Sequence, residues 1–133
     1  MDVPAFARAY GNAWASRDTA VFVALFAPDA VYRDDQVGRL SRGHPDLHAF
    51  HAHFVAAISD IRMDFPNAFG NGRDLCLEWV FSGVQTGTYH GRAPTGIGFR
   101  ANGVAVIRLA DDGRIASVTD YYDSAGVQRQ RAA

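Results

Sequence analysis

The sequence contains no lysine, since all thirteen of its cationic side chains are arginines. A Schiff-base enzyme, a lysine general base and the lysine of a phosphate-binding loop are therefore excluded. The single cysteine, Cys76, has no second cysteine with which to form an internal disulfide. The absence of lysine is the firmest exclusion that the composition provides.

Long apolar runs and a charge of one sign are also missing. No segment approaches the ~20 apolar residues that a membrane-spanning helix needs. The first residues, MDVPAFARAYGNAW, lack the basic region and unbroken apolar run of a secretory signal. The net charge of −1 shows no basic excess of the kind found in nucleic-acid binders. We therefore expect a cytoplasmic protein that binds neither membrane nor nucleic acid, and whose partner is a small molecule or a second copy of the chain.

A length of 133 residues and a hydrophobic content of 48% suit one domain with one core, spanning residues 1–133. Phe6, Tyr10 and Trp14 recur at helical spacing and predict a first amphipathic helix. A short second helix is expected over residues 20–26, capped by Asp18 or Thr19. A third is expected over residues 44–59.

The rest of the chain alternates between apolar and polar residues, which predicts strands. The expected strands cover residues 30–35, 60–65, 74–83, 103–109 and 114–123, and the sequence DDG forms the turn between the last two. Residues 126–133 are expected to be a frayed tail. Helices followed by antiparallel strands predict an α+β fold, in which a curved sheet packs on about three N-terminal helices.

Two adjacent aspartates, Asp34 and Asp35, end the first of these strands. Side chains alternate along a strand, so only one of the two can face inward. Asp34 shares its face with Ala30 and Tyr32, whereas Asp35 shares its face with Arg33, which would be costly to bury unpaired. The pattern favours Asp34 as the inward acid. The alternative is that the strand ends one residue earlier and both aspartates lie in a loop.

A second acid, Asp120, shares the more apolar face of the last strand with Val118 and Tyr122. Desolvation among such neighbours favours the neutral form of a carboxyl and raises its pKa towards the range useful for general acid–base catalysis. The alternative is a structural aspartate, held by the backbone or by an arginine.

Aromatic and histidine side chains are further candidates for the site. Tyr10, Trp14 and Tyr32 can line one space, and His90 lies on a glycine-rich loop between strands, a usual place for a functional residue. Histidines also crowd the third helix, with His44, His48 and His51 on about one side. No carboxylate accompanies them at matching spacing, so we expect no metal site.

Three stretches, ALFAPDAVYRDD, FSGVQTGTYHGRAPTG and DDGRIASVTDYYD, together with the order of elements, resemble the SnoaL-like polyketide cyclases. That group belongs to the nuclear transport factor 2-like superfamily, which also contains the ketosteroid isomerases. The resemblance covers nearly the whole chain. It implies a cone-shaped roll around a deep apolar cavity, cofactor-free acid–base chemistry on hydrophobic carbonyl compounds, and commonly a homodimer packed through the sheet.

The resemblance also assigns roles to individual residues. Tyr10 matches the tyrosine of the isomerase oxyanion hole, and Asp120 matches the late-strand aspartate that is the general acid–base of the cyclases. The isomerase base falls on Asp34 when residues are counted without gaps, or on Asp35 when Val37 and Gly38 anchor the count. Alternation favours Asp34.

Two positions depart from the family pattern. Ala105 stands where the isomerases have the second, protonated acid of the oxyanion hole, which argues against steroid isomerisation. Gln85 stands where SnoaL-like proteins often have a histidine, which leaves the contacts that position the substrate open.

We therefore expect a cofactor-independent enzyme that closes a polyketide ring by aldol chemistry or moves a double bond in a small hydrophobic carbonyl compound. Asp120, Asp34 and Tyr10 are its expected catalytic residues. The expected ligand-binding side chains are Trp14, Tyr32, Phe54, Trp79, His90, Ile107 and Tyr122. One alternative is a non-catalytic module that binds a ligand or forms dimers. Another is water addition to an epoxide, which ranks lower because no arginine is clearly inward.

Overall fold

Two helices open the chain and a third follows the first two strands, and local sequence explains where they begin. The first helix, α1 (Val3–Ala15), follows Asp2, whose side chain accepts a hydrogen bond from the Ala5 backbone N–H (2.9 Å). Asp18 caps α2 (Thr19–Val23) in the same way, and α3 (Gly43–Ala57) has Pro45 in its first turn, where a missing N–H costs no hydrogen bond. The computed structural model describes residues 1–132.

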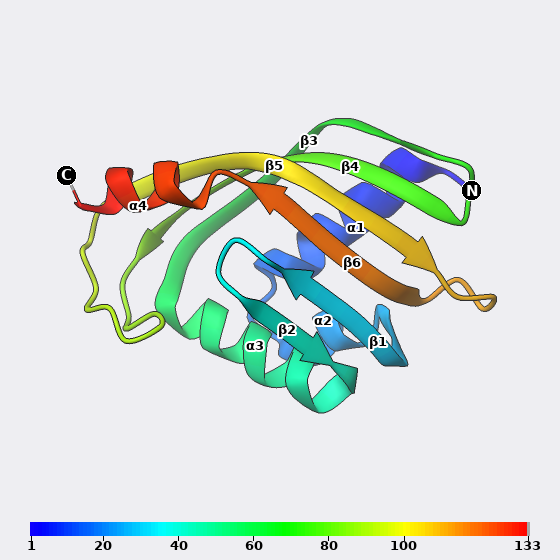
Figure 1. Cartoon of the computed structure of the whole chain (residues 1–133), viewed down its shortest axis with the longest axis horizontal. Coiled ribbons are helices and arrows are strands. Elements are labelled where there is room, and N and C mark those ends of the chain that lie inside the picture. Colours follow the sequence, from blue (N-terminus) through cyan, green and yellow to red (C-terminus); the bar gives the residue numbers. More distant parts are fainter. Residues whose placement is uncertain (133) are drawn as a thin grey trace.

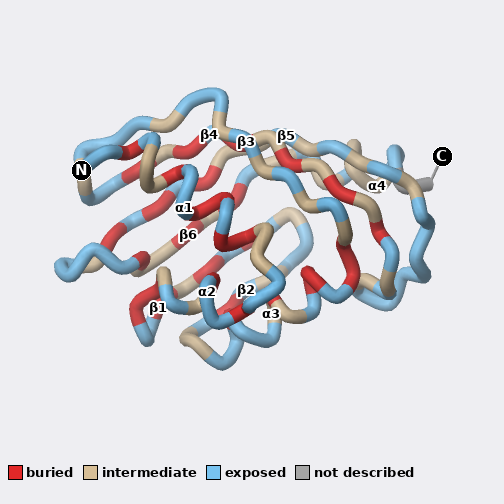
Figure 2. Tube along the Cα trace, turned by 180° about the vertical axis from the view of Figure 1, so that it is seen from behind, coloured by how far each residue is buried: buried red, intermediate tan, exposed pale blue. Residues whose placement is uncertain are grey.

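Six strands form one curved sheet in the order β2-β1-β6-β5-β4-β3. Its neighbouring strands pair antiparallel, except that β1 and β6 run parallel. Figures 1 and 2 show α1 lying across one face of the sheet, with α2 and α3 beside it near β1 and β2. The strands are β1 (Phe26–Asp34), β2 (Arg39–Arg42), β3 (Ile58–Gly70), β4 (Asp74–Gln85), β5 (Gly98–Leu109) and β6 (Ile115–Tyr122).

The core lies between the helices and the concave face of the sheet, as the alternation in the sequence predicted. In β4 every second residue is buried, and Figure 2 shows this alternation of buried and less buried segments along the strands. The buried residues of β4 include Leu75, Leu77, Trp79 and Phe81. The α+β prediction is confirmed. No helix among the described residues is both long and apolar enough to cross a membrane.

Two elements of the structure were not predicted from the sequence, and β3 and β5 are longer than the expected strands. The short strand β2 lies where a loop was expected. Its apolar Leu40 faces outward and its charged Arg39 faces inward, which reverses the usual pattern and hides the strand in the sequence. A C-terminal helix, α4 (Ser124–Ala132), replaces the expected frayed tail, so that prediction was wrong for the described residues; Ala133 lies outside them. Polar contacts hold α4: the Gln130 side chain accepts from the Arg100 backbone N–H and donates to its carbonyl, both at 2.8 Å. Such contacts leave no apolar stripe in the sequence.

The end of α2 also differs from the prediction. The helix ends at Val23, and Phe26 already belongs to β1, which starts four residues before the strand expected at residue 30. Pro28 lies within this strand rather than at the end of a helix.

Candidate active site

Two aspartates face the same interior space from neighbouring strands. In the parallel pair β1–β6, Arg33 lies opposite Thr119, so continuing this register by one residue sets Asp34 beside Asp120. The two are only 6% and 9% exposed, respectively. Asp35 is instead exposed and forms an ion pair with Arg33 (3.7 Å). The argument from strand alternation therefore selected the correct aspartate of the pair.

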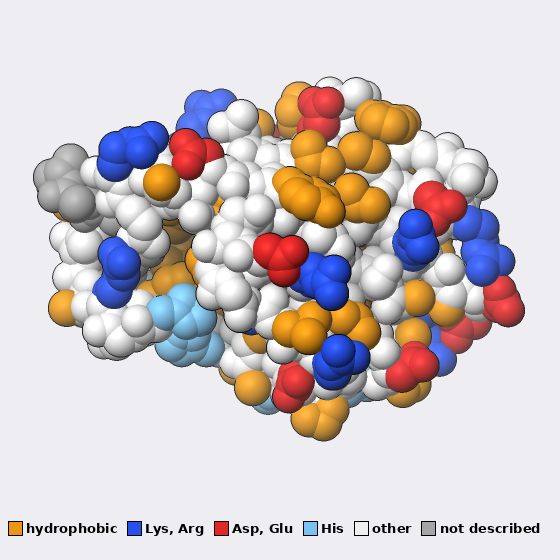
Figure 3. Space-filling model, viewed as in Figure 1, with side chains coloured by type: hydrophobic (Ala, Val, Ile, Leu, Met, Phe, Trp, Pro, Cys, Tyr) orange, Lys and Arg blue, Asp and Glu red, His pale blue; other side chains and the backbone are white. Residues whose placement is uncertain are grey.

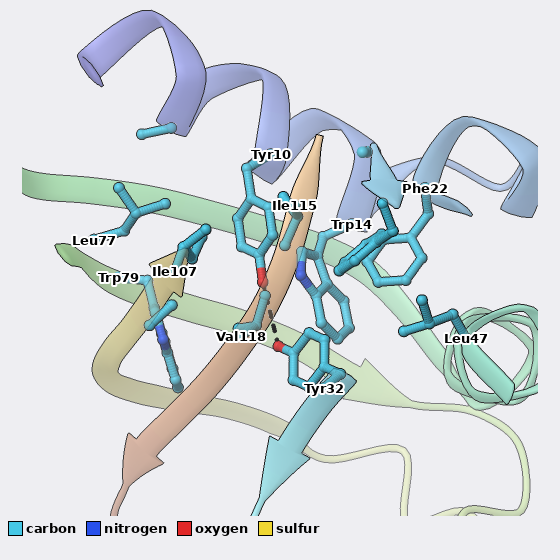
Figure 4. Close-up of a cluster of buried hydrophobic side chains, with 14 of the residues drawn as sticks. Tyr10, Trp14, Phe22, Tyr32, Leu47, Leu77, Trp79, Ile107, Ile115 and Val118 are labelled. Carbon is cyan, nitrogen blue, oxygen red and sulfur yellow. Dashed lines mark hydrogen bonds between the residues drawn. The ribbon is translucent and has the colours of Figure 1, made fainter. Parts of the chain in front are cut away.

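Each of these strands also supplies a tyrosine that donates to the acid of the other strand. Tyr32 in β1 donates its hydroxyl hydrogen to Oδ2 of Asp120 in β6. Tyr122 in β6 donates to Oδ2 of Asp34 in β1 (2.8 Å). The Tyr10 hydroxyl from α1 lies 3.3 Å from that of Tyr32, and Figure 4 shows the two hydroxyls pointing toward each other. A hydrogen-bonded chain thus runs from α1 through β1 to Asp120.

The surroundings of Asp120 change its acidity. Burial raises the pKa of Asp120 from 3.8 to about 7, the hydrogen bond from Tyr32 opposes that rise, and the nearby Asp34 carboxylate adds to it. Burial likewise raises the pKa of Tyr32 and of Tyr122 above the ordinary range, so both hydroxyls stay protonated and can donate. Near neutral pH, Asp120 is therefore available in both its acidic and its basic form.

Gln36 links the two acids and was not foreseen from the sequence. When its amide nitrogen faces the acids, it donates to Oδ1 of Asp34 (3.2 Å) and to the backbone carbonyl of Asp120 (2.8 Å). It lies in the turn between β1 and β2, where a glutamine has no sequence signature of function. The turn therefore holds the acids in place from outside the two strands.

The acids open into a largely apolar cavity of about 150 Å³. Its wall combines α1, α3 and the concave face of the sheet, and α4 closes one side with Val127 and Gln128. Its apolar and aromatic lining includes Trp14, Phe50, Phe54, Ile58, Met63, Trp79, Phe81, Tyr89, Phe99 and Tyr122. A cavity of this kind suits a small hydrophobic compound with a few polar groups.

Comparison with protein families identifies the arrangement. The family model of the SnoaL-like polyketide cyclases matches residues 5–131. The chain belongs to that family. No curated protein matches the sequence of this SnoaL-like protein significantly.

Solved structures share the fold of this SnoaL-like chain at low sequence identity. A hypothetical protein from Catenulispora acidiphila with a ketosteroid isomerase-like fold, in complex with trimethylamine, has a TM-score of 0.84 at 23% identity, over 98% of this chain and 94% of its own. TsrD from Streptomyces laurentii has a TM-score of 0.79 at 21% identity, over 95% and 91%. An LEH-like epoxide hydrolase from M. tuberculosis has a TM-score of 0.74 at 16% identity, over 94% and 85%.

Most of the expected ligand-binding side chains of this SnoaL-like protein do line the cavity: Trp14, Phe54, Trp79, His90 and Tyr122. Tyr32 and Ile107 do not. Trp14 and Phe50 cover Tyr32 with their rings, and Ile107 packs in the core opposite Val118. Strand alternation correctly placed Tyr32 and Ile107 on the inward face of the sheet. It does not show whether an inward side chain reaches the cavity or is covered by other core residues.

Tyr10 also lies behind the cavity wall, at 1% exposure. Its hydroxyl reaches Tyr32 rather than the open space, so any influence on a ligand passes through Tyr32 and Asp120. The direct contact with substrate expected for Tyr10 is therefore absent from this arrangement.

The two tryptophans that line the cavity bring buried N–H donors. The indole nitrogens of Trp14 and Trp79 are buried without a hydrogen bond of regular geometry in the described part of the chain. The Trp79 N–H lies close enough to Asp120 to lower its pKa somewhat, and the Trp14 N–H does the same for Tyr10. The Trp79 donor is thus available beside the acid.

Gln85 is fully buried and shapes the loop on which His90 lies. Its amide nitrogen lies 3.0 Å from the carbonyl oxygens of Gly87 and Arg92 and 3.2 Å from that of Ala93. His90 adopts a left-handed backbone conformation (φ 48°), and its N–H donates to Nε2 of His53 (3.3 Å). Gln85 therefore positions the loop rather than the ligand directly.

The histidines of α3 have separate surroundings. His51 is fully buried, with Nδ1 2.9 Å from the Thr19 hydroxyl and Nε2 3.1 Å from the Trp14 carbonyl. Nε2 of His44 lies 2.8 Å from the Phe26 carbonyl. Over residues 1–132, no group of three or more histidine, cysteine, aspartate or glutamate side chains is arranged to hold a metal ion.

Arg39 is the cavity residue that the sequence reasoning missed most clearly. It lies opposite Asp34 in the β1–β2 register and lines the cavity, with its guanidinium carbon 3.4 Å from the centre of the Phe50 ring. The expectation that no arginine is clearly inward was therefore wrong. The signal was masked because the neighbouring Leu40, 43% exposed, takes the outward position that a charged residue usually occupies.

Proposed function

We propose that the protein is a cofactor-independent acid–base enzyme that moves a proton next to the carbonyl of a small hydrophobic compound. The observation that carries the proposal is the pair Asp34 and Asp120, two buried carboxyl groups with different hydrogen-bond partners that share one apolar cavity. Paired acids in unequal environments allow one to be ionised while the other is protonated. Ring closure by aldol addition and a shift of a double bond are the two outcomes that this chemistry supports.

In the proposed step, the ionised Asp120 carboxylate removes the proton from the carbon next to the substrate carbonyl. The electron pair of the broken C–H bond moves into the carbonyl system and forms an enolate, while Asp120 becomes the acid. In aldol closure the enolate carbon attacks a second carbonyl, and Asp120 returns its proton to the resulting alkoxide. In isomerisation Asp120 returns the proton to a different carbon. Both routes conserve atoms and charge without a cofactor.

The enolate oxygen needs a hydrogen-bond donor in the dry cavity. The Trp79 N–H meets this need, because it is buried, close to Asp120 and without a regular partner. Tyr10 and Tyr32 would act one step away, by holding Asp120 in place and adjusting its pKa.

Deuterium exchange tests the first step without knowledge of the natural substrate. The hydrophobic ketone 2-tetralone, incubated with the protein in D₂O, should exchange the protons next to its carbonyl faster than in buffer alone, as followed by NMR. Asp120→Asn should reduce the enzymatic rate by about 10²–10⁴-fold, the usual contribution of a general acid–base group. Asp35→Asn, which changes the exposed neighbour of Asp34, should leave the rate unchanged. Exchange that is equally fast with Asp120→Asn would rule out the assigned role.

Arg39 favours a second candidate, the opening of an epoxide by water between two acids. That chemistry calls for an arginine beside the aspartates, and Arg39 lines the cavity next to Asp34. Arg39 forms no ion pair with either acid in the described residues, which ranks this reaction second. If the wild-type protein hydrolyses styrene oxide to its diol and Asp120→Asn does not, epoxide opening becomes the leading candidate function.

A non-catalytic binding module is the remaining alternative. It predicts that Tyr10, Asp34 and Asp120 do not converge. Asp34 and Asp120 line one cavity, which supports catalysis over binding alone, whereas Tyr10 lies behind the cavity wall and reaches Asp120 only through Tyr32.

A further inference from the structure

The Arg39 guanidinium is held in the cavity wall by contacts with uncharged groups. It stacks on the Phe50 ring at 3.4 Å and lies 4.7 Å from the centre of the Tyr32 ring. Its Nη1 donates to the Ser41 hydroxyl (3.1 Å). Stacking on a ring face leaves the edge of a guanidinium, with its fork of N–H donors, free to bind in the plane. Arg39 is therefore fixed in position while most of its donors remain available.

No carboxylate neutralises this cation directly. In the part of the chain that the structure describes, the ion pairs join other arginines to exposed aspartates, and Arg39 has no acidic oxygen within 4.0 Å. Its strand neighbour Asp34 accepts instead from Tyr122 and Gln36. Stacking on Phe50 makes this half-buried cation tolerable, and the charge of Asp120 acts on it only from a distance. A ligand that supplies an anion would form the direct, charge-assisted hydrogen bonds that Arg39 lacks.

The charges around the cavity are compatible with an anionic ligand. Arg92 is a second arginine in the lining, and its Nη1 donates to the Gln128 side chain of α4. Arg39 and Arg92 thus share the cavity lining with Asp34 and Asp120, and Asp120 is partly protonated near neutral pH because burial raises its pKa to about 7. A ligand with one negative charge would therefore not meet a net negative cavity.

We propose that the substrate is a hydrophobic carboxylic acid whose carboxylate binds to the Arg39 guanidinium in the plane of its N–H fork. The hydrophobic part of the molecule would fill the aromatic cavity, and its carbonyl would reach Asp120. This proposal rests on the proposed function for the role of Asp120, but the binding of the carboxylate does not require turnover. It narrows the substrate class from carbonyl compounds to keto acids and related acids.

Two probes of nearly equal size separate charge from shape: 2-naphthoate and its neutral counterpart 2-naphthamide. Isothermal titration of the wild-type protein should show 2-naphthoate binding on the order of 10–100-fold more tightly, the usual effect of charge-assisted hydrogen bonds. Arg39→Met should abolish this preference and leave 2-naphthamide binding within about twofold of wild type. Arg39→Lys should retain part of it, because lysine keeps the charge but lacks the planar fork. Arg92→Met should retain most of it.

Several outcomes would overturn the proposal. One is a wild-type protein that does not prefer 2-naphthoate, including one that fails to bind it at millimolar concentration. Another is an Arg39→Met variant, with a circular dichroism spectrum like wild type, that binds both probes equally weakly, since Arg39 would then act only by packing on Phe50. If Arg39→Met does not fold, Arg39→Lys decides, and an unchanged affinity ratio would contradict binding through the fork.

An Asp120→Asn background separates this proposal from the proposed function. There the preference for 2-naphthoate should persist although deuterium exchange of 2-tetralone is lost. Loss of the preference in that background would mean that Arg39 acts through the charge of Asp120, and would also overturn the proposal. If wild type and Asp120→Asn both prefer 2-naphthoate but neither catalyses exchange of 2-tetralone, the carboxylate-binding role of Arg39 stands and the proposed acid–base activity is rejected.

Discussion

Asp34 and Asp35 are neighbours in the chain, yet only one of them belongs to the cavity. Asp34 accepts hydrogen bonds inside it, whereas Asp35 faces solvent beside Arg33. The sequence allowed this assignment because burying Arg33 without a partner would be costly. The same reasoning could not find Arg39, because stacking on Phe50 makes an inward arginine tolerable and no alternation rule includes that contact.

The two neighbouring aspartates provide a matched pair of variants. Asp34→Asn should slow deuterium exchange of 2-tetralone at least about tenfold. It removes the negative charge that helps to raise the pKa of Asp120, and a lower pKa makes Asp120 a weaker base. Asp35→Asn should stay within about twofold of wild type. NMR-monitored exchange with both purified variants checks this, and equal rates for the two would refute a role for Asp34.

The raised pKa of Asp120 makes stability depend on pH. The pKa of Asp120 is about 7 in the folded protein, compared with 3.8 for an ordinary aspartate such as that of the unfolded chain. The folded state therefore holds the Asp120 proton more tightly than the unfolded state does. The stabilisation from this group is thus complete below about pH 4 and is lost as pH rises through about 7.

Asp120→Asn should remove that loss, because an amide does not ionise in this range. The free energy of unfolding of wild type should fall between pH 4 and pH 8 by up to about 4 kcal/mol more than that of the variant. Urea unfolding at the two pH values measures the difference. The exposed variant Asp35→Asn serves as the control and should follow wild type.

At the scale of elements, the sequence predicted those held by apolar contacts and missed those held by polar ones. The stripes of α1 and β4 repeat with the period of a helix and a strand, so they are visible in the sequence. The helix α4 depends on Gln130 and its two hydrogen bonds with the Arg100 backbone, and β2 turns an arginine inward. Contacts of these kinds depend on residues that are distant in the sequence, so the local pattern of apolar and polar residues does not predict them.

The loop from residue 86 to residue 97 depends on Gln85 in a similar way. Gln85→Met would keep the volume of the side chain but leave the carbonyls of Gly87, Arg92 and Ala93 without their donor. The free energy of unfolding should fall by about 1–3 kcal/mol. Hydrogen–deuterium exchange should rise in this loop more than in α1. Unchanged exchange in the loop would mean that other contacts hold it.

At the scale of the whole molecule, the outer face of the sheet carries exposed apolar side chains. Figure 3 shows hydrophobic side chains gathered over the middle strands. Val106 in β5 and Tyr121 in β6 are 39% and 53% exposed, and Val104 in β5 lies opposite Tyr121 in the sheet. Contiguous exposed apolar side chains are a common feature of protein–protein interaction sites. We propose that two copies of the chain pair through this face, the homodimer that the family resemblance implies.

Val106→Glu should weaken that pairing, because it places a charge in the apolar patch while the inward neighbours Ala105 and Ile107 stay unchanged. Analytical ultracentrifugation should find wild type with the mass of a dimer and the variant with that of a monomer at the same concentration. Val21→Glu, at an exposed valine of α2, is the control and should remain dimeric. A monomeric wild type would reject the proposal.

The position of β6 has a consequence for how the protein is made. This strand lies between β1 and β5 and so joins the pair β2–β1 to the trio β5-β4-β3. It also follows the other five strands in the sequence, so β1 to β5 must all be synthesised before the two parts of the sheet can meet. Contacts between such distant segments form late and slowly. A growing chain therefore carries Asp34 without Asp120, and the appearance of the proposed activity would report the completion of folding.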